Sequence, residues 1–413
     1  MDHLAAEKPN YSNDNKMIKN KTNHLLNAII HKTWLYAVLI SLSCNSQFKP
    51  KLEQEVEVIE AQKRSILKFS SFVERIEYFV LPDDLPIRYI DKVMANDELY
   101  FLCDFYFSMG VVILDKNFEH IGTVKNFGEG PKEYPYIRDV TINNDLNTID
   151  ILSLTKILRF DFNGDFLEEF RIPIQFTNFQ HLKKDDYMIY IPSYFTEGLA
   201  NEELSGFVLF NWDSGKNLIT PVIPQHYKNG LPAVTDNNIL SKWNNDCFFS
   251  MTYSDTIYCL NEDNHIKRKY VLDFGKGQFP VELLSKYNVP DKQYEERIKP
   301  YSFQRANLYA SDKYIITTYI DKNGFSPIIY NRDTKLSLYG TISVNDIDHG
   351  SDKIVPKLLK NNVLYSFYES DILLSYYEYH IEKLTEVDNE FTKLVRGLDK
   401  ESSPLVITKY FLK

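Results

Sequence analysis

Six copies of one pattern run along the 413-residue chain and limit its fold more than any other feature. Each copy has a polar corner rich in Asp, Asn or Lys, a short β-rich run, a variable turn, a second β-rich run and a closing turn. In the first copy the corner at 96–98 precedes the run at 99–102, and a second run covers 110–114. Apolar and polar residues alternate with a period of two within the runs, which is typical of paired strands.

The spacing of the copies indicates one repetitive domain. Their first runs begin at Leu99, Thr148, Tyr187, Cys247, Tyr314 and Val363. The steps are 49, 39, 60, 67 and 49 residues, so loops of different lengths separate similar units. Small antiparallel sheets repeated about six times form a β-propeller, whose radial packing hides most strand edges. Two unrelated β-sandwiches would explain the number of strands, but not their recurring order.

We therefore predict an all-β fold, a six-bladed β-propeller with blades of about four antiparallel strands. The 29 Tyr and 27 Phe of the chain fit the pleated, packed faces of such sheets. A ring also needs its ends joined. Residues 75–81 and 404–413 are both strand-like, and we predict that these terminal strands complete one shared blade and close the ring.

The N-terminal part has the features of an export signal. The apolar core at 34–40 follows Lys19, Lys21 and Lys32 and precedes small residues. It is too short to span a bilayer, which needs about 20 apolar residues. A buried N-terminal helix is the alternative. Met17 is a second candidate for the start of translation, because it gives a signal of ordinary length.

Cys44 follows Leu42-Ser43 in a stretch that resembles the lipobox of bacterial lipoproteins, from which it departs at Ser41. The resemblance implies that Cys44 is lipidated and becomes the new N-terminus; plain secretion is the alternative. We thus expect a leader and signal peptide at 1–43, a charged tether at 44–64 and the propeller at 65–413. Loss of five lysines and three acids with residues 1–43 changes the net charge from −10 to −12. Such an acidic protein is not expected to bind nucleic acid.

The other cysteines do not form a disulfide framework. Only Cys103, Cys247 and Cys259 remain after Cys44, an odd and sparse set. Cys247 and Cys259 flank an apparent hairpin, in which a three-residue loop would place them opposite each other and a two-residue loop would not. The alternatives are a disulfide and, as we prefer, two buried thiols.

Several stretches resemble a known family. Residues 126–134 are similar to the G-x-G-P-x-E-Y signature of six-bladed β-propeller lipoproteins of gut-type Gram-negative bacteria. Residues 160–167 resemble its blade turn, which NHL-type propellers share, and the similarity spans about 65–413. Further similar stretches are 254–258, 270–276 and 345–350, where His349 departs from the family pattern. The resemblance implies the fold and an envelope location, and no activity.

Two loops carry candidate ligand positions. Gly128, Gly130, Glu133 and Tyr134 belong to a glycine-rich run that lacks the Lys-Ser/Thr ending of a phosphate loop. A turn between blades, tied down by Glu133 or Tyr134, is the structural interpretation.

The second loop holds Asp346, Asp348, His349 and Asp352. Its three carboxylates stand on alternate residues, as in loops that wrap calcium, although no Glu closes it. Calcium is therefore the one cofactor that we consider, and a polar turn capped by Asp side chains is the alternative.

The sequence has no catalytic motif: His-Glu-x-x-His, Cys-x-x-Cys and Gly-x-Ser-x-Gly are all absent. Residues 281–298 are expected to form an amphipathic helical insertion that decorates one face. We expect a monomeric envelope lipoprotein, a noncatalytic binding or scaffold propeller that engages a protein, peptide or glycan. The alternative is a propeller enzyme, a lyase or glycan hydrolase, with a loop-borne metal site at the central channel.

Overall fold

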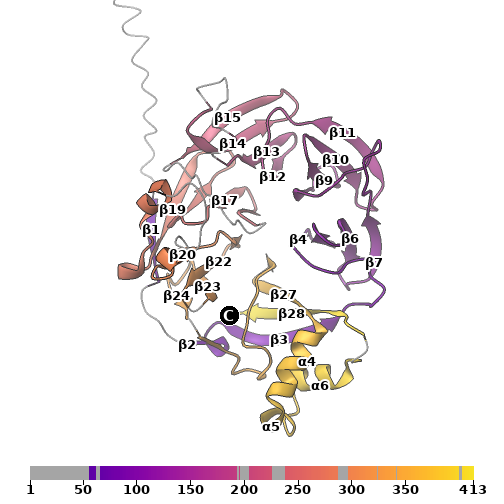
Figure 1. Cartoon of the computed structure of the whole chain (residues 1–413), viewed down its shortest axis with the longest axis vertical. Helices are drawn as coiled ribbons and strands as arrows, with labels where there is room; N and C mark the ends of the chain where they lie inside the picture. Colours follow the sequence, from indigo (N-terminus) through magenta and orange to yellow (C-terminus); the bar gives the residue numbers. More distant parts are fainter. Residues whose placement is uncertain are drawn as a thin grey trace, which may run out of the picture. The chain divides into compact units, whose positions relative to one another are not determined.

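Six small antiparallel sheets stand around a ring in the computed structural model of the protein (Figure 1). The structure describes residues 55–61, 66–192, 195, 204–225, 238–286, 296–322, 324–340, 342–399 and 402–413. These all belong to one compact unit, Gln54–Lys413. The predicted signal at 1–43, the lipidation site Cys44 and the first part of the tether lie outside the described residues. The six-bladed β-propeller predicted from the repeats is confirmed.

Each blade has four main strands, the first at the channel and the fourth at the rim. The blades are β4(Lys92–Ala95), β5(Leu99–Asp104), β6(Gly110–Asp115) and β7(His120–Val124); β8(Asp139–Asn143), β9(Thr148–Ser153), β10(Lys156–Asp161) and β11(Phe166–Arg171); β12(Asn178–Lys183), β13(Asp186–Tyr190), β14(Phe207–Asp213) and β15(Leu218–Pro224); β16(Leu240–Trp243), β17(Asp246–Ser250), β18(Thr256–Leu260) and β19(Ile266–Asp273); β20(Phe303–Gln304) with β21(Tyr309–Ala310), β22(Tyr314–Asp321), β23(Gly324–Asn331) and β24(Ser337–Tyr339); and β26(Leu358–Lys360), β27(Val363–Glu369), β28(Leu405–Leu412) and β3(Val73–Val80).

The core lies between neighbouring blades. The second strands are mostly buried because a blade packs on each face, and β9 is buried along its whole length, whereas the rim strand β11 is largely exposed. Aromatic rings fill these interfaces, as the ring centroids of Phe101 and Phe162, 4.9 Å apart, show between the first two blades. The Tyr and Phe surplus therefore packs between the blades, as the composition predicts.

The termini close the ring in the predicted way. β28, near the C-terminus, pairs antiparallel with β3, near the N-terminus, with Thr408 opposite Tyr78. The sixth blade is thus built from both ends of the propeller chain (Figure 1). Opening the ring requires this whole ladder of backbone hydrogen bonds to break.

The tether expected at 44–64 is too long, because part of it belongs to the folded propeller. Residues 55–60, which were assigned to it, form β1(Glu55–Glu60), a fifth strand parallel to β19 at the rim of the fourth blade. Ile59 is buried there, and Glu55 accepts a 3.0 Å hydrogen bond from Nε of Arg268. Glu57 is half-buried on the same side of β1 as Ile59 and pairs with Arg268 and Lys335, whereas Val56 and Val58 are exposed. A second parallel pair joins β2(Ile66–Lys68), which is followed by the 3-10 turn η1(Phe69–Ser71), to β25(Ile342–Val344).

Two helical insertions differ from the sequence expectations. The insertion at 281–298 is confirmed in position, but after η2(Gly275–Gly277) its described part starts as the 3-10 helix η3(Val281–Lys286) instead of an amphipathic α-helix. Helices α4(Ser370–Tyr379), α5(Ile381–Leu384) and α6(Glu390–Gly397) join β27 to β28 and were not predicted. None of the helices in the described part is long and apolar enough to cross a membrane.

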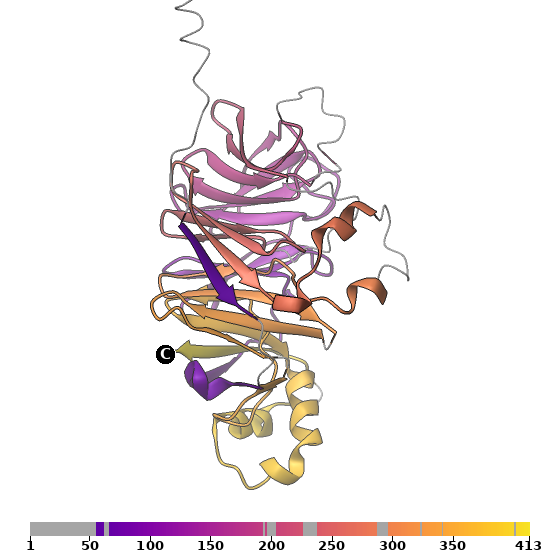
Figure 2. The same cartoon turned by 90° about the vertical axis from the view of Figure 1, so that its left-hand side faces the viewer.

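The ring has two unlike faces. On one, which we call the short-turn face, the strands of each blade are joined by turns of 2 to 5 residues. On the opposite, long-loop face, the connections within and between blades range from 2 to 35 residues. Figure 2 shows the ring from the side, with the C-terminus at the short-turn face on the left and η3 in orange on the right. Both helical insertions belong to the long-loop face.

Candidate functional site

The central channel opens on the short-turn face into a cavity of about 740 Å³, the channel mouth, which residues from all six blades line. Amide side chains are frequent in its wall: Asn96, Asn144, Asn147, Asn244 and Asn361 from the turns, and Gln180 from β12. Trp243 adds an aromatic surface. The wall is polar because the first strands end here and turn back, and Asn is well suited to such turns; Asn244 and Asn361 both have positive φ.

The cations of the channel mouth contact backbone oxygens. Nζ of Lys242 donates to the carbonyl of Leu182, and Nζ of Lys360 donates to the carbonyl of Asn96 and lies 4.7 Å from the ring centroid of Tyr100. Desolvation lowers the pKa of Lys360, although the nearby acids oppose this. The lysines therefore fix turns of neighbouring blades at this face.

His181 is the histidine of the channel mouth, and its contacts are structural. It is buried, its Nε2 lies 3.0 Å from the carbonyl oxygen of Lys184, and its ring meets Tyr187 edge-on at 5.4 Å. Desolvation lowers its pKa, more than the hydrogen bond to Lys184 raises it. His181 is thus neutral at neutral pH and holds the turn between β12 and β13.

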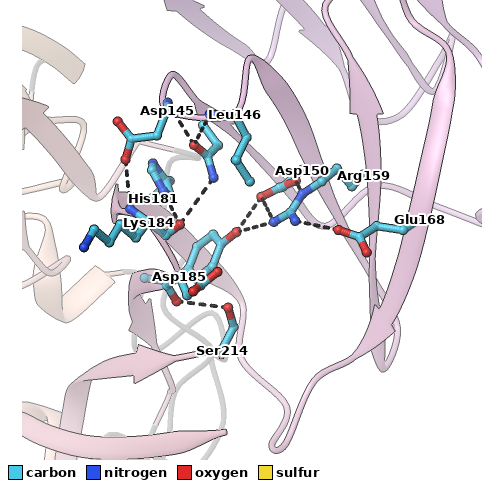
Figure 3. A network of polar contacts seen from close by, with 11 residues as sticks. Asp145, Leu146, Asp150, Arg159, Glu168, His181, Lys184, Asp185 and Ser214 are labelled. Carbon is cyan, nitrogen blue, oxygen red and sulfur yellow. Dashed lines mark hydrogen bonds and ion pairs between the residues drawn. The ribbon is translucent and has the colours of Figure 1, made fainter. Parts of the chain in front are cut away.

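The second and third blades are joined by a polar network below the channel mouth (Figure 3). Asp150 is fully buried and accepts from Nε of Arg159 at 2.7 Å and from the hydroxyl of Tyr187 at 2.6 Å. Nη1 of Arg159 also donates to Glu168 at 2.7 Å. Nearer the surface, Asp145 accepts from the backbone N–H of Lys184 at 2.8 Å. These groups satisfy one another and lock two blades together.

The channel mouth does not contain the metal site that the enzyme alternative requires. Across the described residues, no three His, Cys, Asp or Glu side chains gather in a group that could hold a metal ion. His120, His265, His349 and His380 lie in different regions of the ring, and His226 lies outside the described residues. The described part of the chain therefore offers no constellation for metal-assisted catalysis.

The glycine-rich loop between the first two blades has the structural role that the sequence indicates. The carboxylate of Glu133 accepts from the N–H of Gly130 at 2.7 Å, and a Cβ on Gly128 would lie 2.0 Å from Glu133 Oε2. Tyr134 is fully buried, and its hydroxyl donates to the carbonyl of Met109 at 2.9 Å. The glycines make room for the carboxylate that ties the loop down.

The aspartates of the other predicted loop point to different partners. Asp346 accepts from the hydroxyl of Ser70 at 2.6 Å, and Asp348 accepts from the hydroxyl of Tyr78 at 2.7 Å. Asp352 accepts from the N–H of Asn345 at 2.6 Å. The three carboxylates thus do not fit a calcium site: Asp346 and Asp348 fasten this loop to the chain around η1 and β3, and Asp352 holds the loop itself. Neighbouring His349 has a φ of 57°, the left-handed conformation in which Gly would be unstrained.

Sequence reasoning missed a group of exposed aromatic side chains on the long-loop face. We call Tyr89, Tyr106 and Phe107 the aromatic platform; they are 43%, 70% and 65% exposed. The rings of Tyr89 and Phe107 are 6.0 Å apart at 61°. These residues come from the loop at 81–91 and from the turn between β5 and β6.

One buried carboxylate holds the platform in place. Asp104, at the end of β5, is fully buried and accepts hydrogen bonds from five backbone N–H groups on both loops. The donors are Arg88 at 3.4 Å, Tyr89 at 3.2 Å, Tyr106 at 3.2 Å, Phe107 at 2.8 Å and Ser108 at 2.9 Å. Burial raises the pKa of Asp104, but these hydrogen bonds outweigh it and hold the pKa below its usual value.

A cavity of about 820 Å³, the platform pocket, lies beside these rings. Its wall includes Tyr89 and Phe107, the loop at 81–88, Glu369 before α4, and residues 403–405. Its size is within the range of small-molecule sites. The platform pocket therefore lies between the first blade, the sixth blade and the ends of the α4–α6 insertion.

Comparison with known proteins identifies the family. Residues 53–409 match the family described as "Domain of unknown function (DUF4934)". The chain belongs to the DUF4934 family. No curated protein matches it.

A solved structure shows the same fold. A Bacteroides fragilis protein described as exported superposes on the DUF4934 chain with a TM-score of 0.67 and 14% identity, covering 86% of this chain and all of that one. A DUF4221 family member from Bacteroides vulgatus has a TM-score of 0.48 and 12% identity, and covers 83% of this chain and 97% of its own.

The sequence of this DUF4934 chain held a weak signal for the platform. In the run at 104–108 a carboxylate is followed by Phe-Tyr-Phe-Ser, between two strands. Three consecutive residues with large side chains in a turn cannot all be buried. This signal did not point to a surface site, because aromatic residues in β proteins are more often buried in the core than exposed on the surface.

Proposed function

We propose that this protein is a noncatalytic binding protein of the cell envelope, and that it engages its ligand with the long-loop face. The aromatic platform is the observation that carries the proposal. A group of exposed aromatic side chains on one surface is typical of a recognition site, and the Asp104 carboxylate holds the backbone that carries these. Ligands that suit such a surface are glycans, peptides and proteins.

The position of β1 supports this face as the outward one. β19 runs from the short-turn face to the long-loop face, and β1 is parallel to it, so the chain enters β1 at Glu55 on the short-turn side. The eleven residues from Cys44 to Gln54 can span at most about 40 Å. A lipid on Cys44 would therefore be linked to the propeller from the short-turn side, which is opposite the platform.

Export and lipidation are proposed from the sequence at 34–44. The exported description of the Bacteroides fragilis protein with the same fold agrees with export. We propose that the mature protein is an acylated monomer. Labelling with an alkyne fatty acid should mark the full chain and not its Cys44→Ala variant; equal labelling of both would contradict the anchor.

The binding role is tested with protein, peptide and polysaccharide fractions of bacterial envelopes. The purified full chain should retain material from one fraction, and a Tyr106→Ala/Phe107→Ala double variant should retain about ten times less. Leu218→Ala, which removes an exposed apolar side chain on a rim strand, is the matched control and should behave as the wild type. Retention that does not depend on the platform, or turnover of a substrate in these fractions, would contradict the proposal.

A further inference from the structure

The platform pocket has an unusual combination of walls. Two aromatic rings meet at 61°, so a ligand that lies flat on one presents its edge to the other. Around them stand the exposed carboxylates Asp83 and Glu369, the guanidinium of Arg88 and the hydroxyl of Ser403, which donates to Asp371 at 2.8 Å. Acceptor oxygens and a guanidinium donor thus surround an apolar surface.

This combination matches the chemistry of a sugar ring. A pyranose has an apolar face of C–H groups and a rim of hydroxyls that donate and accept hydrogen bonds. The C–H face can stack on Tyr89 or Phe107, while the hydroxyls donate to the carboxylates and accept from Arg88. A volume of about 820 Å³ leaves room for more than one such ring.

The charges around the pocket distinguish neutral from anionic sugars. The pocket wall holds two acids, Asp83 and Glu369, and one permanent cation, Arg88. Beside it, Asp371 accepts from Ser403, and Nζ of Lys357 lies 5.6 Å from the ring centroid of Tyr89, so the acids outnumber the cations by three to two. An anionic sugar would bring a further negative charge beside these carboxylates. A neutral sugar adds none.

We propose that the platform pocket binds a neutral oligosaccharide, an inference that rests on the proposed binding role of the long-loop face. The backbone that carries the rings is fixed before binding, because Asp104 accepts from the N–H of Phe107 and Asp91 accepts from the N–H of Phe105 at 2.7 Å. Little loop ordering is then required on association, which favours binding of an uncharged ligand. Proline-rich peptides also dock in aromatic-lined grooves, and their binding is the competing outcome of the test.

The experiment is titration calorimetry of the full chain with defined oligosaccharides. The probes are cellohexaose, xylohexaose, mannohexaose and chitohexaose, which are neutral, and hexagalacturonate, which is anionic. At least one neutral probe should bind, and Phe107→Ala should weaken it about tenfold. Tyr379→Ala removes an aromatic side chain that is 85% exposed and lies outside the pocket, so its affinity should equal that of the wild type.

A second variant tests the charge argument. Asp83→Asn with Glu369→Gln keeps the shape of both side chains and removes their charge, so the preference for neutral over anionic probes should shrink. Binding of hexagalacturonate alone, neutral binding that Phe107→Ala leaves unchanged, or binding of none of the probes would overturn the inference. If the probes fail but an envelope protein or peptide is retained through Tyr106 and Phe107, the proposed function stands and only the ligand class is wrong.

Discussion

The two faces of the ring use their polar side chains differently. On the short-turn face, polar groups reach from one blade to the next: Asn96 Nδ2 lies 3.4 Å from Asn144 Oδ1, and Lys184 donates to Asp145. On the long-loop face, Asp104 satisfies the backbone of its own loops, and the aromatic side chains of those loops stay exposed. The difference indicates that one face maintains the ring and the other is available to a ligand.

The largest effect should come from the network below the short-turn face. Asp150→Ala removes the partner of a buried guanidinium, and loss of one member of a buried ion pair costs about 3–5 kcal/mol. Urea denaturation followed by tryptophan fluorescence should show this loss. Glu168→Gln is the control, because Glu168 is 56% exposed in its ion pair with Arg159 and should cost under about 1 kcal/mol. Equal losses of stability in the two variants would contradict the difference between the buried and the exposed partner of Arg159.

A smaller effect is expected from the glycine-rich loop between the first two blades. In Gly128→Ala the new Cβ collides with the carboxylate of Glu133, so Glu133 must move and leave the N–H of Gly130 without its partner. We expect a loss of about 1–3 kcal/mol in the free energy of unfolding. Gly397→Ala meets no atom within 4 Å at the end of α6 and should be neutral or slightly stabilising. A neutral Gly128→Ala would show that Glu133 does not fix this loop.

The pH dependence of stability should reveal Asp104. Its pKa is lower in the folded protein than in the unfolded chain, so its contribution is present above the unfolded pKa of about 3.9 and is lost as the pH falls through the folded pKa. The stability difference between wild type and Asp104→Asn should therefore be constant from about pH 7 to 5 and shrink below about pH 4. A difference that grows on acidification would contradict the role of the carboxylate.

The smallest effect on stability should come from the platform itself. Phe107 is 65% exposed, so Phe107→Ala should change the free energy of unfolding by less than about 0.5 kcal/mol. Thermal unfolding of the purified variant measures this. A large loss of stability would mean that the aromatic ring of Phe107 is part of the core. It would weaken the contrast between the two faces of the propeller.

The sequence was sufficient to predict the propeller, because the repeated alternation of strands and turn residues is a local property of each blade. Closure by 75–81 and 404–413 was predictable for the same reason. The strand β1 was not predictable, because Glu55 and Glu57 resemble a charged tether in the sequence. Their ion pairs with Arg268 are visible only in the structure. Helices α4–α6 were not predicted, because the repeated pattern describes only pairs of strands.

The candidate site was less predictable. The carboxylates at 346, 348 and 352 have spacing that suits calcium, but their partners Ser70 and Tyr78 are more than 250 residues away in sequence. The platform depends on contacts between two loops about 15 residues apart, which no local pattern describes. Only the three-dimensional structure shows that Asp104 faces both loops.

Hydrogen exchange measured on the full chain, with and without the envelope fraction that it retains, tests the central claim most directly. If the long-loop face binds the ligand, exchange should slow at 86–91 and 105–109 and stay unchanged at 241–245 in the channel mouth. Protection at 241–245, with none at the platform loops, would contradict the account.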